Sequence, residues 1–272
     1  MFPLRIKYMG DNMLTDILCG VLLPLLGTVL GSACVYFMKG RFNIFVQKAL
    51  VGFAAGVMTA ASVWSLIIPA IERCESLGNF AFLPAVIGFW CGILFLFAVD
   101  RLLPHISLSC RRKDRTATEF YKTVMLVFAV ALHNLPEGMA VGAVYSAIVS
   151  GDENVSLSAA FTLSLGIAIQ NFPEGAIISM PLNANGLKKN KAFAFGVISG
   201  VIEPLGACLT ILVSVLVVPL LPFFLSFAAG AMIYVVVNEL IPELSDDNCC
   251  AYGIFMFSLG FSVMMSLDVA LG

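Results

Sequence analysis

His133-Asn134-Leu135-Pro136-Glu137-Gly138 and Gln170-Asn171-Phe172-Pro173-Glu174-Gly175 are two versions of one hexapeptide, and each lies inside a long apolar run. A glutamate near the centre of a bilayer costs about 2.5–3.5 kcal/mol on insertion scales, so it marks a functional site by default. The 272 residues around these motifs are 60% hydrophobic and 12% charged, whereas soluble domains contain about 25% charged residues. The chain is therefore predicted to be an integral membrane protein.

The apolar runs are long enough for transmembrane helices, each of which needs roughly 20 mostly apolar residues. Eight segments qualify, and we expect an all-α protein in which residues 1–272 form a single transmembrane domain with short connections. Glycine and proline are tolerated inside such helices because neighbouring helices satisfy the backbone. The expected helices are 14–38, 48–70, 80–103, 121–147, 156–182, 192–217, 219–242 and 251–271.

The first apolar run has an alternative interpretation as a cleaved leader. Arg5 and Lys7 precede it, and residues 30–34 resemble a signal-peptide or lipoprotein cleavage site. The run from Met13 to Met38 is longer than a signal-peptide core, which favours a spanning helix.

The basic residues predict the orientation, since cytoplasmic loops carry an excess of Lys and Arg. With the N-terminus outside, the outer side receives only Arg5, Lys7 and Arg73 of the 15 Lys and Arg residues. Both termini are therefore expected outside. The acidic stretch 243–247 is the exception that this topology places inside. We interpret the basic loop 104–120 as a solvated topology determinant, with lipid-headgroup contact or regulation as the alternative.

One face of the expected helix 121–147 combines an imidazole, an amide and a carboxylate, because His133, Asn134 and Glu137 are three or four residues apart. The proline before each glutamate lacks an N–H and frees a carbonyl, so both helices should bend at the motif. The expected helix 156–182 runs in the opposite direction and presents the motif from the other side of the membrane, through Gln170, Asn171 and Glu174. Two kinked packing helices would explain the prolines, but they would leave both glutamates uncompensated.

Two more glutamates lie inside expected helices: Glu203 precedes Pro204, and Glu239 follows Asn238. No expected helix interior contains Lys or Arg, so these carboxylates are either protonated or bound to cations. The amides and the histidine beside them favour cations. Imidazole with carboxylates suits Zn²⁺, Fe²⁺, Mn²⁺ or Cd²⁺, whereas oxygen ligands alone would suit Mg²⁺ or Ca²⁺. Because the ligands outnumber those of one tetrahedral Zn²⁺, we hypothesise two adjacent metals.

The paired hexapeptides resemble the ZIP family of divalent-metal transporters, and Gln-Asn-x-Pro-Glu-Gly is similar to its GufA-type branch. The resemblance covers essentially the whole chain and implies eight helices in a 3+2+3 inverted-repeat arrangement around a binuclear mid-membrane site. The metal ligands that it implies are Met58, His133, Asn134, Glu137, Gln170, Asn171, Glu174 and Glu203. It further implies a transport pathway through Ser65, Asn238, Glu239 and Asp268. Many relatives have histidine where this chain has Gln170 and Asn238, so this site is richer in oxygen and its preference for Zn²⁺ is weaker.

The expected function is transport of divalent transition-metal cations into the cytosol by alternating access, with Zn²⁺ foremost and Cd²⁺, Fe²⁺ and Mn²⁺ as further substrates. The resemblance implies that helices one, four, five and six move against the rest, and small-residue runs such as 52–56 allow helices to slide. We expect a homodimer in the cell membrane, with the metal as substrate and no cofactor.

A metal-gated channel or a metal sensor is the main alternative to a transporter. An intramembrane metallohydrolase is disfavoured because the two histidines are too far apart to form an HExxH motif. Nucleic-acid binding is not expected, since the sequence shows no basic face.

Overall fold

The computed structural model describes residues 11–38, 43–109, 134–152, 155–184, 186–245 and 250–271. These residues are almost entirely helical, and no strand occurs among them. The predicted ligand His133 lies outside the described residues, as does the 110–120 part of the predicted loop. The remainder of that loop continues the preceding helix to Ser109.

Six helices of the described chain are long and apolar enough to cross a membrane. Two of them contain a π-helical turn, so each of these two helices consists of an α-helical, a π-helical and a second α-helical element in succession. Short helices η2 (Glu75–Phe80), α9 (Ser214–Val217) and η3 (Val218–Leu220) lie in connections. The six are α2 (Asp11–Phe37), α3–η1–α4 (Ile44–Ala61, Ser62–Ile67, Ile68–Glu72), α5 (Phe82–Ser109), α8 (Lys189–Leu212), α10–η4–α11 (Leu221–Val235, Val236–Leu240, Ile241–Ser245) and α12 (Cys250–Leu271).

The fourth and fifth predicted helices correspond to a helical segment of residues 134–150 and to α7 (Leu157–Ala184). The first is described only from residue 134. The second is 28 residues long, but polar residues such as Asn171 and Glu174 lower its hydropathy, and it is not among the six. The count of eight spanning helices and the 3+2+3 arrangement therefore stay predictions.

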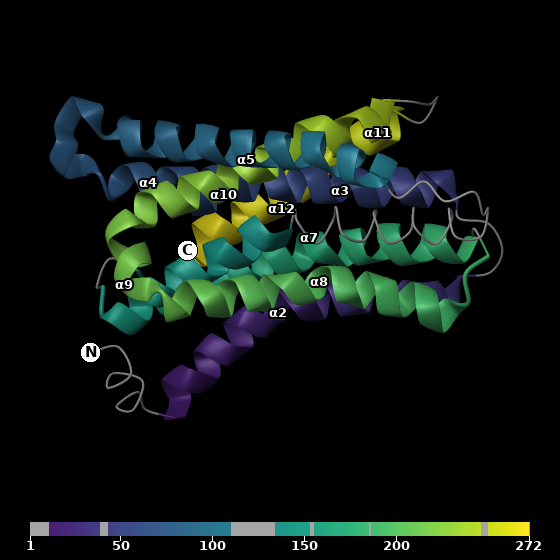
Figure 1. Cartoon of the computed structure of the whole chain (residues 1–272), viewed down its shortest axis with the longest axis horizontal. Helices are drawn as coiled ribbons and strands as arrows, with labels where there is room; N and C mark the ends of the chain where they lie inside the picture. The colour runs from purple at the N-terminus through teal and green to yellow at the C-terminus, as the bar shows by residue number, and fades with distance from the viewer. Residues whose placement is uncertain are drawn as a thin grey trace.

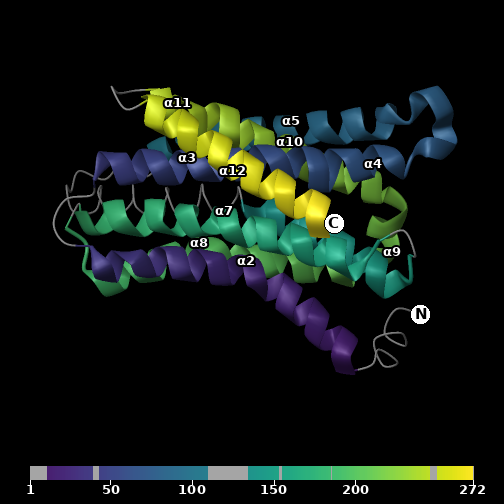
Figure 2. The same ribbon diagram turned by 180° about the vertical axis from the view of Figure 1, so that it is seen from behind.

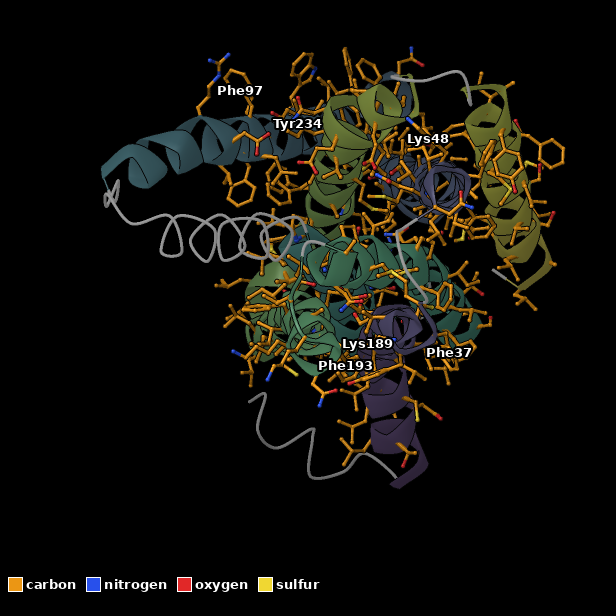
Figure 3. All side chains as sticks on the ribbon, turned by 90° about the vertical axis from the view of Figure 1, so that its right-hand side faces the viewer. Phe37, Lys48, Phe97, Lys189, Phe193 and Tyr234 are labelled. Carbon is orange, nitrogen blue, oxygen red and sulfur yellow. The ribbon has the colours of Figure 1, made fainter. Side chains whose placement is uncertain are left out.

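The long helices pack into two groups, which separate in the end-on view of Figure 3. We call α2, the 134–150 helix, α7 and α8 the α7 group. The α3 group consists of α3–η1–α4, α5, α10–η4–α11 and α12. Most of these helices follow the long axis of the molecule (Figure 1). Following the orientation predicted from the basic residues, the end with Phe37 and Ile44 is called the inner end, and the end with Glu72 is called the outer end.

Glycines bring helix backbones into contact inside the α3 group. A Cβ atom at Gly52 or Gly56 of α3 would collide with the carbonyl oxygens of Gly253 and Phe257 of α12. Such small residues allow close helix packing within a membrane. The sequence predicts that the 52–56 run allows helices to slide. Gly52 and Gly56 of this run instead pack α3 closely against α12 within one group.

Glycines also bring helix backbones into contact inside the α7 group. At the boundary between the two groups, the contact is made by a side chain instead. A Cβ at Gly138 in the 134–150 helix would meet the carbonyl oxygen of Glu203 in α8. Among the described helix glycines, Gly166 of α7 is the one whose nearest neighbours lie in the other group, and those neighbours are side-chain atoms of Met264. The backbones are therefore locked within each group, whereas a flexible side chain fills the boundary.

Prolines explain the irregular parts of these helices. The outer half of α2 veers away from the other helices (Figure 2), and Pro24 lies inside this helix. Pro69 and Pro242 follow the π-helical turns η1 and η4. Proline lacks an N–H and its ring clashes with the carbonyl four residues earlier, which here belongs to Ser65 or Asn238. A wider π turn relieves that clash, and such turns are frequent at functional sites.

Candidate metal centre

The α7 group holds the predicted ligands of the hexapeptides that fall within the described residues. Asn134 and Glu137 extend from the 134–150 helix, the Gln170, Asn171 and Glu174 side chains from α7, and Glu203 from α8. Five of the six residues are at most 2% exposed, and Glu174 is partly buried. The structure thus brings the ligands from three helices into one interior region.

Two amide–carboxylate pairs organise this region. Gln170 Nε2 donates to Glu137 Oε1 at 2.7 Å, and Asn171 Nδ2 donates to Glu203 Oε2 at 2.7 Å. Successive residues of an α-helix point about 100° apart, so Gln170 reaches the 134–150 helix while Asn171 reaches α8. Asn171 Nδ2 also donates to the carbonyl of Pro24 in α2 at 3.3 Å. Residues 170 and 171 of α7 therefore connect all four helices of the group.

Each member of these pairs keeps one oxygen free. Glu137 Oε2, Gln170 Oε1, Asn171 Oδ1 and Glu203 Oε1 are buried and have no hydrogen-bond partner among the described residues. A buried polar atom without a partner typically costs about 1–3 kcal/mol. The amide N–H donors fix which oxygen of each side chain stays available. Four preoriented oxygens from three helices are a donor set suited to a cation.

The three carboxyl side chains of the cluster are also close to one another. Glu137, Glu174 and Glu203 interact electrostatically, and a bound cation would offset the repulsion between their ionised forms. Within the described chain, no group of three His, Cys, Asp or Glu side chains has by itself the geometry to hold a metal. The amide oxygens of Asn134, Gln170 and Asn171 must therefore contribute to any site built from these residues.

The centre opens into a cavity of about 170 Å³ at the boundary between the two groups. The α7 group contributes Asn134, Glu137, Gln170 and Glu174 to its lining. The α3 group contributes Ala54, Met58, Val235, Glu239, Leu240 and Glu243. The predicted ligand Met58 thus faces the cluster from the opposite group, and its thioether is a soft metal ligand. Glu239, predicted for the pathway, lines the same cavity.

Asn238 and Glu243 differ in their relation to this cavity, and the predicted pathway role of Asn238 stays a prediction. Asn238 Nδ2 donates to Asp100 Oδ2 of α5 at 3.1 Å, and Tyr234 Oη donates to the same atom at 2.8 Å. Asn238 is not part of the cavity lining. Glu243 does line it, although the sequence had marked this residue only as a topology exception. Its spacing of four residues from Glu239 was the signal that could have found it.

Glu243 is held in place by α3. Gln47 Nε2 donates to Glu243 Oε1 at 2.6 Å, and the ammonium group of Lys48 donates to the backbone carbonyl of Glu243. The cavity of the metal centre therefore extends along η4 and α11 toward the inner end, where a fixed carboxylate borders it.

The other two predicted pathway residues meet at a second cavity, of about 340 Å³, near the outer end. Ser65 Oγ of η1 donates to Asp268 Oδ2 of α12 at 2.5 Å, and both residues line this cavity. Glu72 and Arg73 also line it, while Val144 and Leu163 contribute from the α7 group. The two cavities share no lining residue.

A helical membrane protein with a buried carboxylate–amide cluster at the boundary of two helix groups belongs to the class of membrane proteins that handle cations. Comparison with known proteins specifies the class further. Residues 109–268 match the family model described as ZIP zinc transporter. The chain belongs to the ZIP zinc transporter family, as the paired hexapeptides predicted.

Named relatives cover nearly the whole chain. Zinc transporter ZIP11 of Xenopus tropicalis is 34% identical over 93% of this chain and 98% of the relative. Zinc transporter GufA of Myxococcus xanthus is 32% identical over 97% of this chain and 100% of the relative. Zinc transporter ZIPB of Bordetella bronchiseptica is 36% identical over 90% of this chain and 78% of the relative. All three are named as transporters rather than as enzymes.

Proposed function

We propose that this protein carries divalent transition-metal cations across the membrane into the cytosol by alternating access between its two helix groups. One observation carries the proposal: four buried carboxylate and amide oxygens from three helices have no hydrogen-bond partner among the described residues, and two of these side chains, Glu137 and Gln170, line the cavity between the groups. Three clustered carboxylates need positive charge in a membrane interior. Zn²⁺ is the foremost substrate, in keeping with the names of the relatives.

The donor set supports more than one bound metal. The described ligands offer carboxylate and amide oxygens together with the thioether of Met58. The sequence also predicts His133, which precedes Asn134, as a nitrogen ligand. This number exceeds the four ligands of a tetrahedral Zn²⁺, so we propose a binuclear centre bridged by Glu137 and Glu174. Mixed oxygen and nitrogen ligation also admits Cd²⁺, Fe²⁺ and Mn²⁺.

The pathway follows from the two cavities. A cation enters from outside past Ser65 and Asp268, binds the cluster, and leaves past Glu239 and Glu243 toward the inner end. Because the cavities share no lining residue, a carrier that exposes them in turn is favoured over an open channel. A homodimer in the cell membrane completes the proposal.

Uptake into liposomes tests this function. Purified protein is reconstituted into liposomes that enclose a fluorescent zinc indicator. Zn²⁺ influx is then recorded over a range of external Zn²⁺ concentrations. We expect saturable influx for the natural chain and background influx for Glu137→Ala. The matched control is Glu75→Ala, since Glu75 is exposed on η2 and should retain influx. Equal influx in the natural chain and Glu137→Ala would exclude the proposed centre.

Two further measurements refine the proposal. Competition of Cd²⁺, Mn²⁺ and Fe²⁺ against Zn²⁺ in the same liposomes ranks the substrates. Metal content per chain, compared between the natural protein and Glu174→Ala, tests the binuclear centre. We expect two metals in the natural protein and fewer in the variant, and a constant content of one would rule out the bridge.

A further inference from the structure

Eight side-chain hydrogen bonds of the described residues at the metal centre and its approaches each join two residues of the same helix group. In the α7 group they join Gln170 to Glu137, Asn171 to Glu203, Asn134 to the Ser199 carbonyl and Lys189 to the Tyr36 carbonyl. In the α3 group they join Ser65 to Asp268, Gln47 to Glu243, and both Tyr234 and Asn238 to Asp100. Together with the glycine contacts, these bonds make each group a mechanical unit.

An ion pair near the outer end crosses from one group to the other. Arg73 Nη1 donates to Asp152 Oδ2 at 2.7 Å. Arg73 follows α4 in the α3 group, and Asp152 follows the 134–150 helix in the α7 group. The two side chains are only 16% and 18% exposed, so water screens this pair less than a fully exposed one.

Both partners are attached firmly to helix ends. The 134–150 helix ends at Gly151, whose φ is +78°, in a Schellman-type cap. In this cap the Gly151 N–H donates to the carbonyl of Ile148 at 2.9 Å, and the Asp152 N–H donates to that of Ala147 at 3.0 Å. The backbone N–H of Arg73 donates to the carbonyl of Pro69 at 3.1 Å. A force between these two charged side chains therefore acts on two long helices.

Toward the inner side of the same boundary, Glu174 of α7 and Glu239 of η4 line the metal cavity from opposite groups. The Arg73–Asp152 ion pair thus joins the two groups near the outer end, at a distance from the carboxyl side chains that line the metal cavity.

We propose that the Arg73–Asp152 ion pair is a latch that holds the outer ends of the two groups together and breaks when the centre opens to the outside. This inference rests on the proposed alternating-access function. The latch lowers the population of the outward-open state, and apparent affinity for external metal falls in proportion to that population.

Variants that neutralise one residue of the ion pair distinguish a latch from a direct effect of these charges on the approaching cation. A latch predicts that Arg73→Gln and Asp152→Asn both lower KM for external Zn²⁺, by about three- to tenfold. Charge effects on the approaching cation would instead lower KM in Arg73→Gln and raise it in Asp152→Asn. The double variant Arg73→Asp with Asp152→Arg restores the pair and should return KM toward the natural value. Glu72→Gln alters a neighbouring charge of the same cavity and controls for field effects.

The liposome assay gives these KM values, and Zn²⁺ bound per purified chain verifies that each variant is folded. KM shifts of opposite sign, or no shift in either single variant, would overturn the latch and leave the transport function standing. Absence of uptake by the natural chain would instead remove the proposed function.

Crosslinking gives a second test that does not depend on KM. Arg73→Cys with Asp152→Cys, joined by a short bismaleimide, ties the outer ends permanently and should stop uptake. Each single-cysteine variant treated in the same way should retain uptake, which controls for the eight native cysteines. Undiminished uptake in the crosslinked protein would show that the outer ends need not separate.

Discussion

The two helix groups present polar side chains to their common boundary in different ways. The α7 group holds its ligands in a hydrogen-bonded network, in which Gln170 and Asn171 each donate to a carboxylate at 2.7 Å. The α3 group contributes side chains at separate levels: Ser65 near the outer end, Met58 opposite the cluster and Glu239 toward the inner end. Two of these levels coincide with the π-helical turns η1 and η4.

This difference suggests separate roles: the α7 group determines the affinity for the metal, and the α3 group determines how the metal reaches and leaves the centre. A network locked by hydrogen bonds and backbone contact keeps its geometry when the groups move, so we infer that the α7 group carries the metal. The α3 group offers successive side chains as the boundary shifts. Variants in the α7 group should therefore change metal binding strongly, whereas variants in the α3 group should change rate or selectivity more than affinity.

The largest effect is expected from Glu203→Ala in the α7 group. The change removes a carboxylate and leaves the Asn171 amide without its acceptor in α8. Loss of an outer-shell partner typically weakens metal binding 10- to 100-fold, so loss of a ligand that also orients another should exceed about 100-fold. Titration calorimetry with Zn²⁺ measures the change, with Glu75→Ala as the exposed control. Near-natural affinity would place the metal elsewhere.

A second prediction compares a glycine within the α7 group with one at the boundary. Gly138→Ala forces a Cβ against the backbone of Glu203, whereas Gly166→Ala meets the flexible end of Met264. Overpacking a tight contact costs about 1–3 kcal/mol, and the cost should be smaller where a side chain can move aside. We expect Gly138→Ala to lower both the unfolding temperature and Zn²⁺ affinity more than Gly166→Ala. The reverse order would contradict the assignment of rigid groups.

A third prediction concerns the inner approach in the α3 group. Glu243→Gln preserves an oxygen that accepts from Gln47 but removes a negative charge from the cavity lining. Since such charges concentrate cations locally, we expect turnover to fall about two- to fivefold while Zn²⁺ affinity of the centre stays the same. Uptake rates and calorimetry on one preparation separate these quantities, with Glu75→Gln as the control. A matching loss of affinity would instead make Glu243 a ligand of the centre.

Much of the fold and of the ligand cluster was predictable because membrane thickness and helical periodicity are strong constraints. The apolar run predicted at 251–271 is Cys250–Leu271, and the run at 156–182 is Leu157–Ala184. Spacings of three and four residues placed Asn134 and Glu137 on one helical face, and both line the cavity. These features depend on local sequence alone.

Other features depend on packing between distant segments, which a single sequence does not reveal. A π turn changes the number of residues per turn, so a 3.6-residue periodicity misplaces the side chains around η4. Asn238, which lies within η4, accordingly bonds with Asp100 of α5. The helix against which Gly52 and Gly56 pack could not be predicted for a similar reason. A face of small residues suits a fixed helix contact as well as a sliding one.

The smallest expected effect belongs to Met58, which faces the cluster from the α3 group and is 5% exposed. Met58→Leu keeps the volume and removes the sulfur, and such hydrophobic exchanges usually cost less than 1.5 kcal/mol in stability. Because thioethers bind soft metals best, Cd²⁺ uptake should fall by about twofold relative to Mn²⁺ uptake. Paired Cd²⁺ and Mn²⁺ assays measure that ratio, with Met264→Leu as the matched control. A loss of affinity as large as that of Glu203→Ala would show that both groups carry the metal, and the separation of affinity from access would then fail.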